Sequence, residues 1–269
     1  MKKIENEQMD LILGSGSKGK VFLIEINNSM IVRKIFRKGK RFSLMNEVLI
    51  YEKLKNINNI PKLLSHTDTF INFEYESGYE NLDELLEKIS FKEKILVCKQ
   101  VSEILIECHN IGIVHRDIKP KNILFNIEKQ KVLLIDWECS IQTIDGYFES
   151  DLKDDYGTLI YSPPEFYSKC EVDYRKVDVW QLCFTFLTFI LNNNPCDENI
   201  NNLLNHYKSR KSPEIKISKE KISIFGTEKY KRLNDLLFSK VFVLESDRIT
   251  MNELSEIFKN IHENYLDFI

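Results

Sequence analysis

The sequence lacks an excess of basic residues. Its 38 lysines and arginines stand against 41 aspartates and glutamates, which gives a formal net charge of −3. Proteins that hold nucleic acid or anionic membranes by charge usually carry clustered Lys and Arg. Because no polybasic run is present, the composition predicts neither nucleic acid nor an anionic membrane as a partner.

Long hydrophobic runs and a leader pattern are also missing. The longest apolar run, at 179–191, is interrupted by Gln181 and two threonines and is too short to cross a bilayer, so it predicts a buried helix. The first seven residues are charged and lack the apolar core of a signal peptide. Both absences predict an intracellular protein, expected in the cytoplasm, with the nucleus or a host cell left open.

The six cysteines lack the spacing of a metal site. No pair is separated as C-x-x-C, and no Cys/His cluster has zinc spacing, so reduced cytosolic thiols are expected. Cys139 lies three residues after an aspartate, Asp136. We interpret it as a packing cysteine, with a regulatory thiol as the alternative.

The composition is that of a globular protein, and the predicted secondary structure changes along the chain from mainly strands to mainly helices. Apolar residues make up 43% of the 269 residues and charged residues 29%, enough for one large domain or two lobes with their own cores. Apolar runs bounded by turn residues predict strands near 11–13, 21–26, 30–36, 60–64 and 70–75. Helical spacing predicts helices at 42–55, 82–89, 91–110, 179–191 and after Thr250, the last with a capping box.

One short stretch places an acid, cations and an amide together. It reads His115-Arg116-Asp117-Ile118-Lys119-Pro120-Lys121-Asn122 and lies between a predicted helix and a short strand. Asp117 and Asn122 can face one point from either side of a loop, so that one takes a proton while the other holds a metal. Fourteen residues later, Asp136 ends an apolar run. An aspartate after a strand is usually a turn former, but one that follows such a loop is a candidate magnesium ligand.

A glycine cluster lies between the first two predicted strands. Residues 14–21 read G-S-G-S-K-G-K-V, and the glycines allow backbone amides to approach phosphates. A strand follows the cluster, whereas a dinucleotide-binding unit would have a helix there.

Together these stretches resemble protein kinases. The family writes them H-R-D-x-K-x-x-N, G-x-G-x-x-G-x-V and D-F-G, the last replaced here by Asp136-Trp137-Glu138. Residues 157–165 fit G-T-x-x-Y-x-A-P-E, with Pro163 in place of alanine. The resemblance runs from about residue 10 to 262. It implies an α+β, bilobal fold: an N-lobe (1–76) of antiparallel sheet plus the αC helix, and a mainly helical C-lobe (77–269).

The resemblance also implies catalytic roles. Asp117 would orient and deprotonate the substrate hydroxyl, and Lys119 would neutralise the transferring phosphoryl group. Asn122 and Asp136 would hold the metal. Lys34 would hold the α- and β-phosphates. An outward-facing strand lysine is the alternative for that residue.

The partner of Lys34 is expected on the 42–55 helix. Glu47 fits the αC glutamate that pairs with this lysine, with a surface glutamate as the alternative. The helix carries another acid, Glu52, but on another face.

The implied nucleotide site is larger. Val21, Val32 and Leu124 would sandwich the adenine, and Phe73 would be the gatekeeper before a hinge at 76–78. The backbone of 74–76 would bind the adenine edge, and Glu80 would bind the ribose or a basic substrate residue. The full implied set is Leu13, Gly14, Ser15, Gly16, Ser17, Gly19, Val21, Val32, Lys34, Phe73, Glu74, Tyr75, Glu76, Glu80, Leu124 and Asp136.

The function implied is that of a serine/threonine protein kinase, including autophosphorylation, that uses ATP and Mg²⁺, with Mn²⁺ as the alternative ion. Lys119 and Thr158 favour Ser/Thr over Tyr kinases. One alternative is a pseudokinase, a nucleotide-binding or docking module in which Glu138 blocks productive metal binding. A small-molecule kinase is disfavoured by Lys119 and by residues 157–165.

The D-W-E segment departs most from the family. A glycine at position 138 would permit backbone states closed to other residues. Its replacement by Glu138 is expected to bias Asp136 toward the inward state, with Trp137 stacked on His115 and Tyr51.

The acidic segment before Gly157 is a second departure. Arg116 corresponds to the residue that binds an activation-loop phosphate in regulated kinases. Two alternatives stay open: acids replace the phosphate, or the loop is phosphorylated as usual. The candidate acids are Asp151, Asp154 and Asp155; the candidate phosphorylation sites are Thr143, Ser150 and Tyr156.

Two supporting contacts are also implied. Asp178 would brace the catalytic loop, and Arg248 would pair with Glu165.

Overall fold

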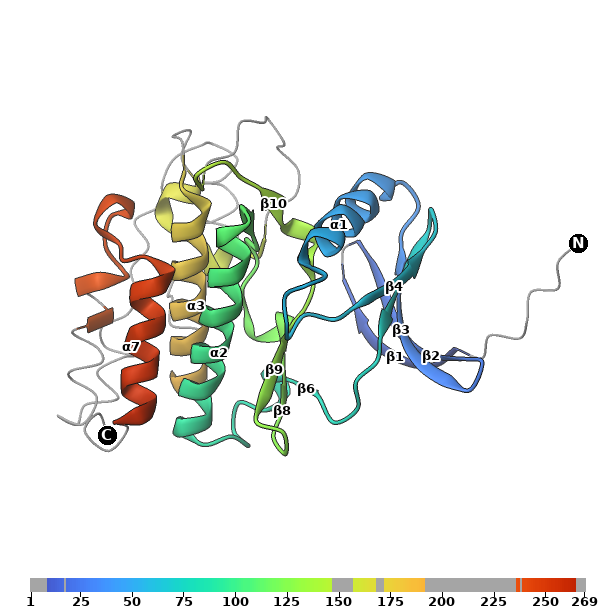
Figure 1. Ribbon diagram of the computed structural model, residues 1–269, viewed down its shortest axis with the longest axis horizontal. Helices are drawn as coiled ribbons and strands as arrows, with labels where there is room; N and C mark the ends of the chain where they lie inside the picture. Colours follow the sequence, from blue (N-terminus) through green and yellow to red (C-terminus); the bar gives the residue numbers. More distant parts are fainter. Residues whose placement is uncertain are drawn as a thin grey trace, which may run out of the picture.

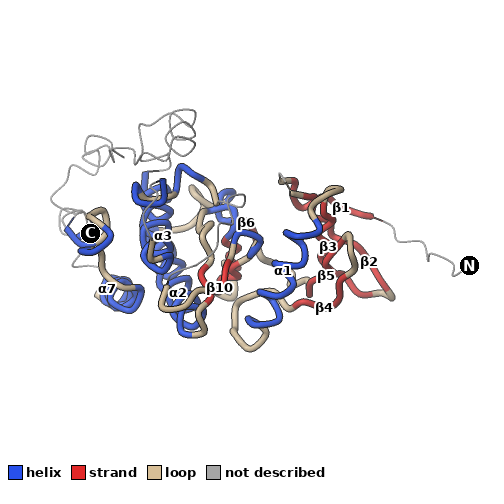
Figure 2. The backbone as a smooth tube through the Cα atoms, turned by 90° about the horizontal axis from the view of Figure 1, so that it is seen from above, coloured by secondary structure: helices blue, strands red, loops and turns tan. Residues whose placement is uncertain are grey.

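The computed structural model describes residues 9–16, 18–146, 157–167, 172–191, 236–237 and 239–264. A five-stranded sheet with one helix forms the first part, and long helices dominate the second (Figure 1). Seen from above, the sheet and the long helices lie at opposite ends of the molecule (Figure 2). The predicted α+β architecture is therefore confirmed. The predicted boundary after Glu76 stays a prediction.

The sheet is antiparallel and has the order β1-β2-β3-β5-β4. Asn27 and Asn28 take positive φ angles of 52° and 62°, which suits the tight hairpin between β2 and β3. The fourth strand begins at Leu63, later than predicted, because Pro61 has no amide hydrogen for a strand ladder. The strands are β1 Met9–Ser15, β2 Gly19–Ile26, β3 Ser29–Phe36, β4 Leu63–His66 and β5 Phe70–Glu74.

Helix α1 (Arg41–Leu54) lies between the sheet and the short helix η3 (Trp137–Cys139) (Figure 1). Its predicted apolar face is buried, with Leu44, Val48, Tyr51 and Leu54 all at most 5% exposed. Burial of this stripe holds the helix in one orientation against the sheet.

The predicted helix at 82–89 is wrong. Only a 3₁₀ helix, η1 (Leu82–Glu84), forms there, followed by turns in which Lys88 and Ile89 donate to the carbonyl of Leu85. Leu82, Leu85 and Ile89 are nevertheless buried. Their helical spacing is satisfied by successive tight turns, and the true helix begins after Ser90.

Among the described residues, three long helices form the second part (Figures 1 and 2). α2 (Phe91–Asn110) and α7 (Met251–Glu263) each begin with a capping box, and the box at Thr250 was predicted. α3 (Tyr174–Leu191) begins earlier than predicted, because the side chain of Asp173 accepts a hydrogen bond from the amide of Arg175. Of the helices that the structure describes, none is long and apolar enough to cross a membrane.

Short elements surround the predicted catalytic residues. β7 leads into residues 115–122 and β8 leads out of them, while β9 ends just before Asp136. The short strands are β6 Glu80–Asn81, β7 Ile113–Val114, β8 Ile123–Asn126, β9 Lys131–Leu134 and β10 Ile141–Gln142. The other 3₁₀ helices of the described part of the chain are η2 Pro120–Asn122, η4 Leu159–Tyr161, η5 Pro164–Tyr167 and η7 Glu245–Asp247.

Candidate active site

Asp117 lies at the centre of a hydrogen-bonded network. Its Oδ2 accepts from Lys119 Nζ at 2.7 Å and from Asn122 Nδ2 at 3.0 Å. Its Oδ1 accepts from the Thr158 amide at 2.6 Å, and Lys119 also donates to the Thr158 hydroxyl at 2.6 Å. The Asp117 residue is 5% exposed. The loop defined by residues 115–122, hereafter the catalytic loop, thus holds an acid, a cation and an amide within direct contact.

Side chains of helix α3 form hydrogen bonds with the backbone of this loop. The two oxygens of Asp178 accept from the amides of His115 at 3.0 Å and Arg116 at 2.8 Å. A third contact joins Asp178 to His109 at 2.9 Å. Asp178 is fully buried, and these hydrogen-bond donors replace the water that its carboxylate loses on burial.

Two further brace residues were missed from the sequence. Gln181 accepts from the amide of Ile118 and donates to the carbonyl of Arg116, both at 3.0 Å. Thr185 donates to the carbonyl of Ile118 at 3.2 Å. With Asp178 they are spaced i, i+3 and i+7, so they share one face of α3. That polar spacing along a mostly apolar stretch of α3 was the available signal.

His115 is held as a neutral imidazole. Burial lowers its pKa. Nε2 lies 3.1 Å from the carbonyl of Ile135, and Nδ1 accepts from the Asp117 amide at 3.2 Å, so the proton is assigned to Nε2. Its ring lies 4.5 Å from that of Trp137, in the predicted arrangement, whereas Tyr51 lies against Phe73 at 4.6 Å.

A second group of charges surrounds Lys34 on β3. Its Nζ donates to both oxygens of Glu47 at 2.8 and 3.1 Å and to Asp136 Oδ1 at 2.6 Å. Glu138 Oε2 lies 2.9 Å away. Burial alone would lower the pKa of the lysine, but the three carboxylates hold it well above its ordinary value. We call Lys34 and these carboxylates the lysine cluster.

The D-W-E segment accommodates the loss of glycine. Asp136 is left-handed (φ 65°) and directs its carboxylate to Lys34, the inward state that was expected. Glu138 lies within η3 and is absent from the positive-φ positions of the described chain. A side chain at this position therefore introduces no backbone strain. Burial would raise the pKa of Asp136, but the charge of Lys34 keeps it below its ordinary value.

The strand register gathers several predicted nucleotide residues on one sheet face. Val21 is paired with Lys34 across β2 and β3, and Val32 is paired with Phe73 across β3 and β5. Directly paired residues point to the same face, as do residues two apart in one strand. These four side chains therefore share the face that carries Glu47 and α1.

The glycine loop shows a difference among its glycines. A Cβ on Gly19 would lie 2.2 Å from the carbonyl oxygen of Ile35, so the packing itself requires glycine there. A Cβ on Gly14 or Gly16 would meet nothing within 4 Å. Packing within the chain therefore does not require glycine at these two positions. The missing side chains would instead let a ligand approach the backbone closely. Ser17 lies outside the described residues.

The remaining nucleotide candidates are more dispersed. Leu13 and Ser15 lie exposed on β1, and Glu74 ends β5, with its amide donating to the carbonyl of Lys62. Glu80 pairs with Lys88 at 3.2 Å. Tyr75 is half-buried, Glu76 is exposed, and Leu124 is half-buried on β8 beside β6.

The donor atoms fit a hard divalent cation. Asn122 uses its Nδ2 for Asp117, which leaves its amide oxygen, and Asp136 uses Oδ1 for Lys34, which leaves Oδ2. Magnesium prefers such oxygen ligands. Glu47, Asp136 and Glu138 also bring carboxylate oxygens within 4.8 Å of one another, with Lys34 bound to all three.

Arg116 rests against aromatic rings. Its guanidinium lies 4.8 Å from the ring centre of Tyr174 and donates to the carbonyl of Cys139 at 3.3 Å. Thr143 is buried and donates to the carbonyl of Gly112, so its hydroxyl is not presented for phosphorylation. The other candidate phosphorylation sites and acids, Ser150, Tyr156, Asp151, Asp154 and Asp155, lie outside the described residues.

The expected pair between Arg248 and Glu165 is present. Arg248 donates to both oxygens of Glu165, with 3.3 Å from Nη2 to Oε2, and is 1% exposed. Its guanidinium also lies over the ring of Trp180. This pair joins η5 to the segment before α7.

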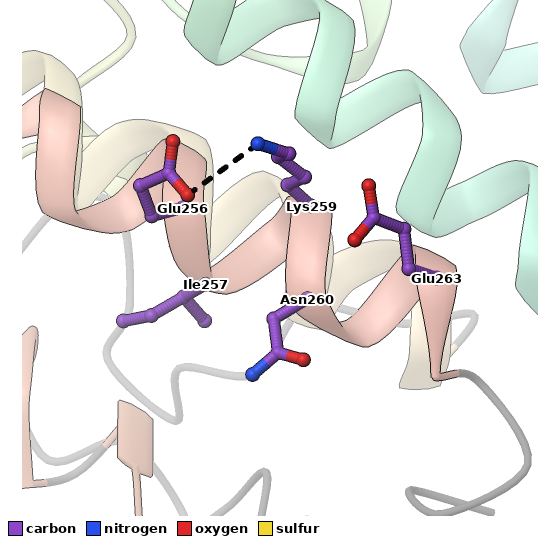
Figure 3. A pocket seen from close by; sticks show the side chains of 5 residues that line it. All are labelled: Glu256, Ile257, Lys259, Asn260 and Glu263. Carbon is purple, nitrogen blue, oxygen red and sulfur yellow. Dashed lines mark ion pairs between the residues drawn. The ribbon is translucent and has the colours of Figure 1, made fainter.

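A hollow of about 420 Å³ lies along α7 (Figure 3). Four of its five lining side chains are exposed and polar, and none belongs to the catalytic loop or the lysine cluster. We assign it no function. The lining residues are Glu256, Ile257, Lys259, Asn260 and Glu263.

A family profile and several known proteins match this chain in sequence. The family profile described as the protein kinase domain matches residues 8–258. A probable casein kinase II subunit alpha homolog of Encephalitozoon cuniculi is 29% identical over 175 residues, 59% of this chain and 54% of that protein. Calcium/calmodulin-dependent protein kinase type 1 of Caenorhabditis elegans is 32% identical over 186 residues, 64% and 52% of the two chains.

A probable serine/threonine-protein kinase of Dictyostelium discoideum is 29% identical over 265 residues, 91% of this chain and 29% of that protein. The matched region spans about half the length of the first two relatives and less of the third.

Proposed function

This chain belongs to the protein kinase domain family, and on that premise we propose that it transfers the γ-phosphoryl group of ATP to serine or threonine hydroxyls of proteins. The observation that carries the proposal is the position of Asp117. Lys119 lies 2.7 Å from its carboxylate, and Asn122 lies 3.0 Å from it. A base, a cation and a metal ligand are thus gathered at one point.

The chain's own residues would divide the chemistry as follows. Asp117 would accept a hydrogen bond from the substrate hydroxyl, orient it and take its proton. Lys119 would neutralise charge on the phosphoryl group as it moves. Phosphoryl transfer depends mainly on positioning and on such neutralisation, so a pre-formed contact between the two residues favours it.

The nucleotide would be held by groups from both parts of the molecule. Lys34, kept charged and oriented by Glu47, would bind the α- and β-phosphates. Asn122 and Asp136 would ligate Mg²⁺, which supplies charge neutralisation at the phosphates. Support comes from the oxygen atoms that these two side chains leave unused within the described contacts.

Serine and threonine are proposed over tyrosine because of Lys119. The family pattern associates a lysine at this position with Ser/Thr kinases, and here it also donates to Thr158 at 2.6 Å. The relative from Dictyostelium discoideum carries the description serine/threonine-protein kinase.

A pseudokinase is the alternative, and one observation favours it. Glu138 lies 2.9 Å from Lys34, where it competes with phosphate for the same ammonium group. Catalysis is supported instead by two hydrogen-bonded pairs of side chains, Lys34 with Glu47 and Asn122 with Asp117.

Labelled ATP separates these alternatives. Purified protein is incubated with [γ-³²P]ATP, Mg²⁺ and a generic basic protein, beside Asp117→Asn, Asp136→Ala and Glu138→Gly variants. We expect label on serine and threonine with wild type, and losses of at least about 100-fold for the first two variants. If the wild type binds nucleotide but transfers no label, and the Glu138→Gly variant does transfer label, the protein is a pseudokinase instead. Label on a metabolite alone would exclude both.

A further inference from the structure

Glu138 lies between two lysines, one on strand β3 and one in the loop between β1 and β2. Its Oε2 is 2.9 Å from Lys34 Nζ, and its Oε1 is 3.7 Å from Lys18 Nζ, in the glycine loop. The side chains are 14%, 10% and 8% exposed, respectively. One carboxylate therefore bridges two ammonium groups in a largely buried environment, where charge interactions are stronger than at the surface.

The backbone holds Lys18 in this position. Its carbonyl accepts from the Arg37 amide at 2.7 Å, and the next residue, Gly19, packs directly on the Ile35 carbonyl. The Gly16 amide donates to the Gly19 carbonyl at 2.9 Å, which closes the loop. Because both flanks are tied down, the lysine side chain enters the site from a defined point.

The two charged residues compensate each other. Around Lys34, Glu138 adds a third negative charge to those of Glu47 and Asp136. Lys18 adds a positive charge beside it. Together the two residues add no net charge to Lys34, Glu47 and Asp136, so Glu138 need not repel an anionic nucleotide as it would alone.

We propose that Lys18 is a second phosphate-binding lysine of the nucleotide site, which Glu138 holds in place until the triphosphate displaces its carboxylate. A phosphate group carries more charge than a carboxylate and offers three acceptor oxygens. An anion of that kind competes effectively for two ammonium groups already gathered around one carboxylate. The inference rests on the proposed ATP site but not on phosphoryl transfer.

Nucleotide binding tests the first half of the proposal. ATP affinity is measured by calorimetry with Mg²⁺, and adenosine affinity by ligand-observed NMR, in wild type, Lys18→Met and Lys20→Met. Lys20 is the matched control, an exposed lysine two residues further along the same segment. We expect Lys18→Met to weaken ATP about tenfold and adenosine less than about twofold, and Lys20→Met to change neither.

Glu138→Gln tests the second half. Removing the competing charge is expected to tighten ATP binding by about threefold or more, and Lys18→Met is expected to weaken ATP in this background as well. If Lys18→Met does not change ATP affinity when it is combined with Glu138→Gln, Lys18 only neutralises the glutamate and the proposal is wrong. Weaker or unchanged ATP binding by Glu138→Gln also overturns it, as does equal loss of ATP and adenosine in Lys18→Met.

Two measurements keep the test independent of folding and of catalysis. Thermal unfolding is recorded for each variant, and Lys18→Arg, which keeps the charge, is expected to retain ATP affinity within about threefold. A larger loss in a folded Lys18→Arg protein counts against the proposal. Repeating the titrations in an Asp117→Asn background should give the same pattern, because binding does not need phosphoryl transfer.

Discussion

The catalytic loop and the lysine cluster are held by different kinds of interaction. The loop's backbone is bound by three side chains of a single helix, Asp178, Gln181 and Thr185. The lysine cluster joins charges from β3, α1 and the D-W-E segment, and Glu138 extends it to the glycine loop. One region is fixed by directional hydrogen bonds to backbone, the other by mutual attraction among side chains.

This difference predicts different responses to perturbation. Hydrogen bonds from one rigid helix hold a single loop geometry, and losing one leaves a buried backbone group without a partner. An ion cluster formed from separate segments responds instead to protonation, to substitution of any member and to an incoming anion. The loop is therefore suited to fixed positioning and the cluster to binding and release.

Asp178→Ala should cause the largest effect. It leaves the buried amides of His115 and Arg116 without acceptors, so we expect about 3–5 kcal/mol lower free energy of unfolding and loss of phosphoryl transfer. Denaturant unfolding measures the first and the labelled-ATP assay the second. Asp247→Ala, at an exposed aspartate, is the control. A change below about 1 kcal/mol would contradict the bracing role.

Gln181→Ala should come second. The amide of Ile118 and the carbonyl of Arg116 lose their partner, at an expected cost of about 1–3 kcal/mol. Urea unfolding compared with Gln142→Ala, at an exposed glutamine, provides the measurement. Equal stability of the two variants would show that α3 supports the loop through Asp178 alone.

Glu47 should give the lysine cluster a pH dependence that the loop lacks. Burial raises the pKa of this carboxyl from its ordinary value of 4.5 to about 7, against the opposing charge of Lys34. Between these values the folded protein binds more protons at Glu47 than the unfolded chain does. Its contribution to stability therefore falls as pH rises through this window, by less than about 1.4 kcal/mol per pH unit.

Unfolding curves of wild type and Glu47→Gln between about pH 4.5 and 8 measure this dependence. The difference in stability, wild type minus variant, should fall with rising pH and level off above about 7.5. A difference that stays flat or rises with pH would mean that Glu47 stays ionised in the folded protein.

Cys139 should give the smallest effect, although it adjoins the lysine cluster. It is 4% exposed, and burial, with the nearby charge of Asp117, raises the pKa of its thiol well above the ordinary value. A thiol of this kind is a poor nucleophile. Mass spectrometry after iodoacetamide treatment should find it unmodified in the folded protein, and rapid labelling would restore the regulatory interpretation.

The sequence located the main elements of the site but not all of its supports. The motifs around Asp117 and Asp136, the helix with Glu47 and the capping box at Thr250 were found because each has a local pattern. Gln181 was interpreted only as an interruption of an apolar run. A single polar residue in such a run does not reveal which backbone group it binds.

Lys18 and Glu138 show the same limit more strongly. They were read as part of a glycine motif and as a departure from another motif, 120 positions apart. Only their distance in the fold makes them a charge pair. The 82–89 segment shows that even local spacing is ambiguous, because successive turns bury the same leucines as a helix would.

The sequence by itself determined the family, the order of the elements and the residue types available for chemistry, because periodicity and motif spacing are properties of the chain. The tertiary structure decided which charges meet. The effect of a buried carboxylate depends on the cations within a few ångströms of it, and chain order does not specify those distances. Glu138 illustrates this, as an isolated negative charge in the sequence and as the bridge between Lys34 and Lys18 in the fold.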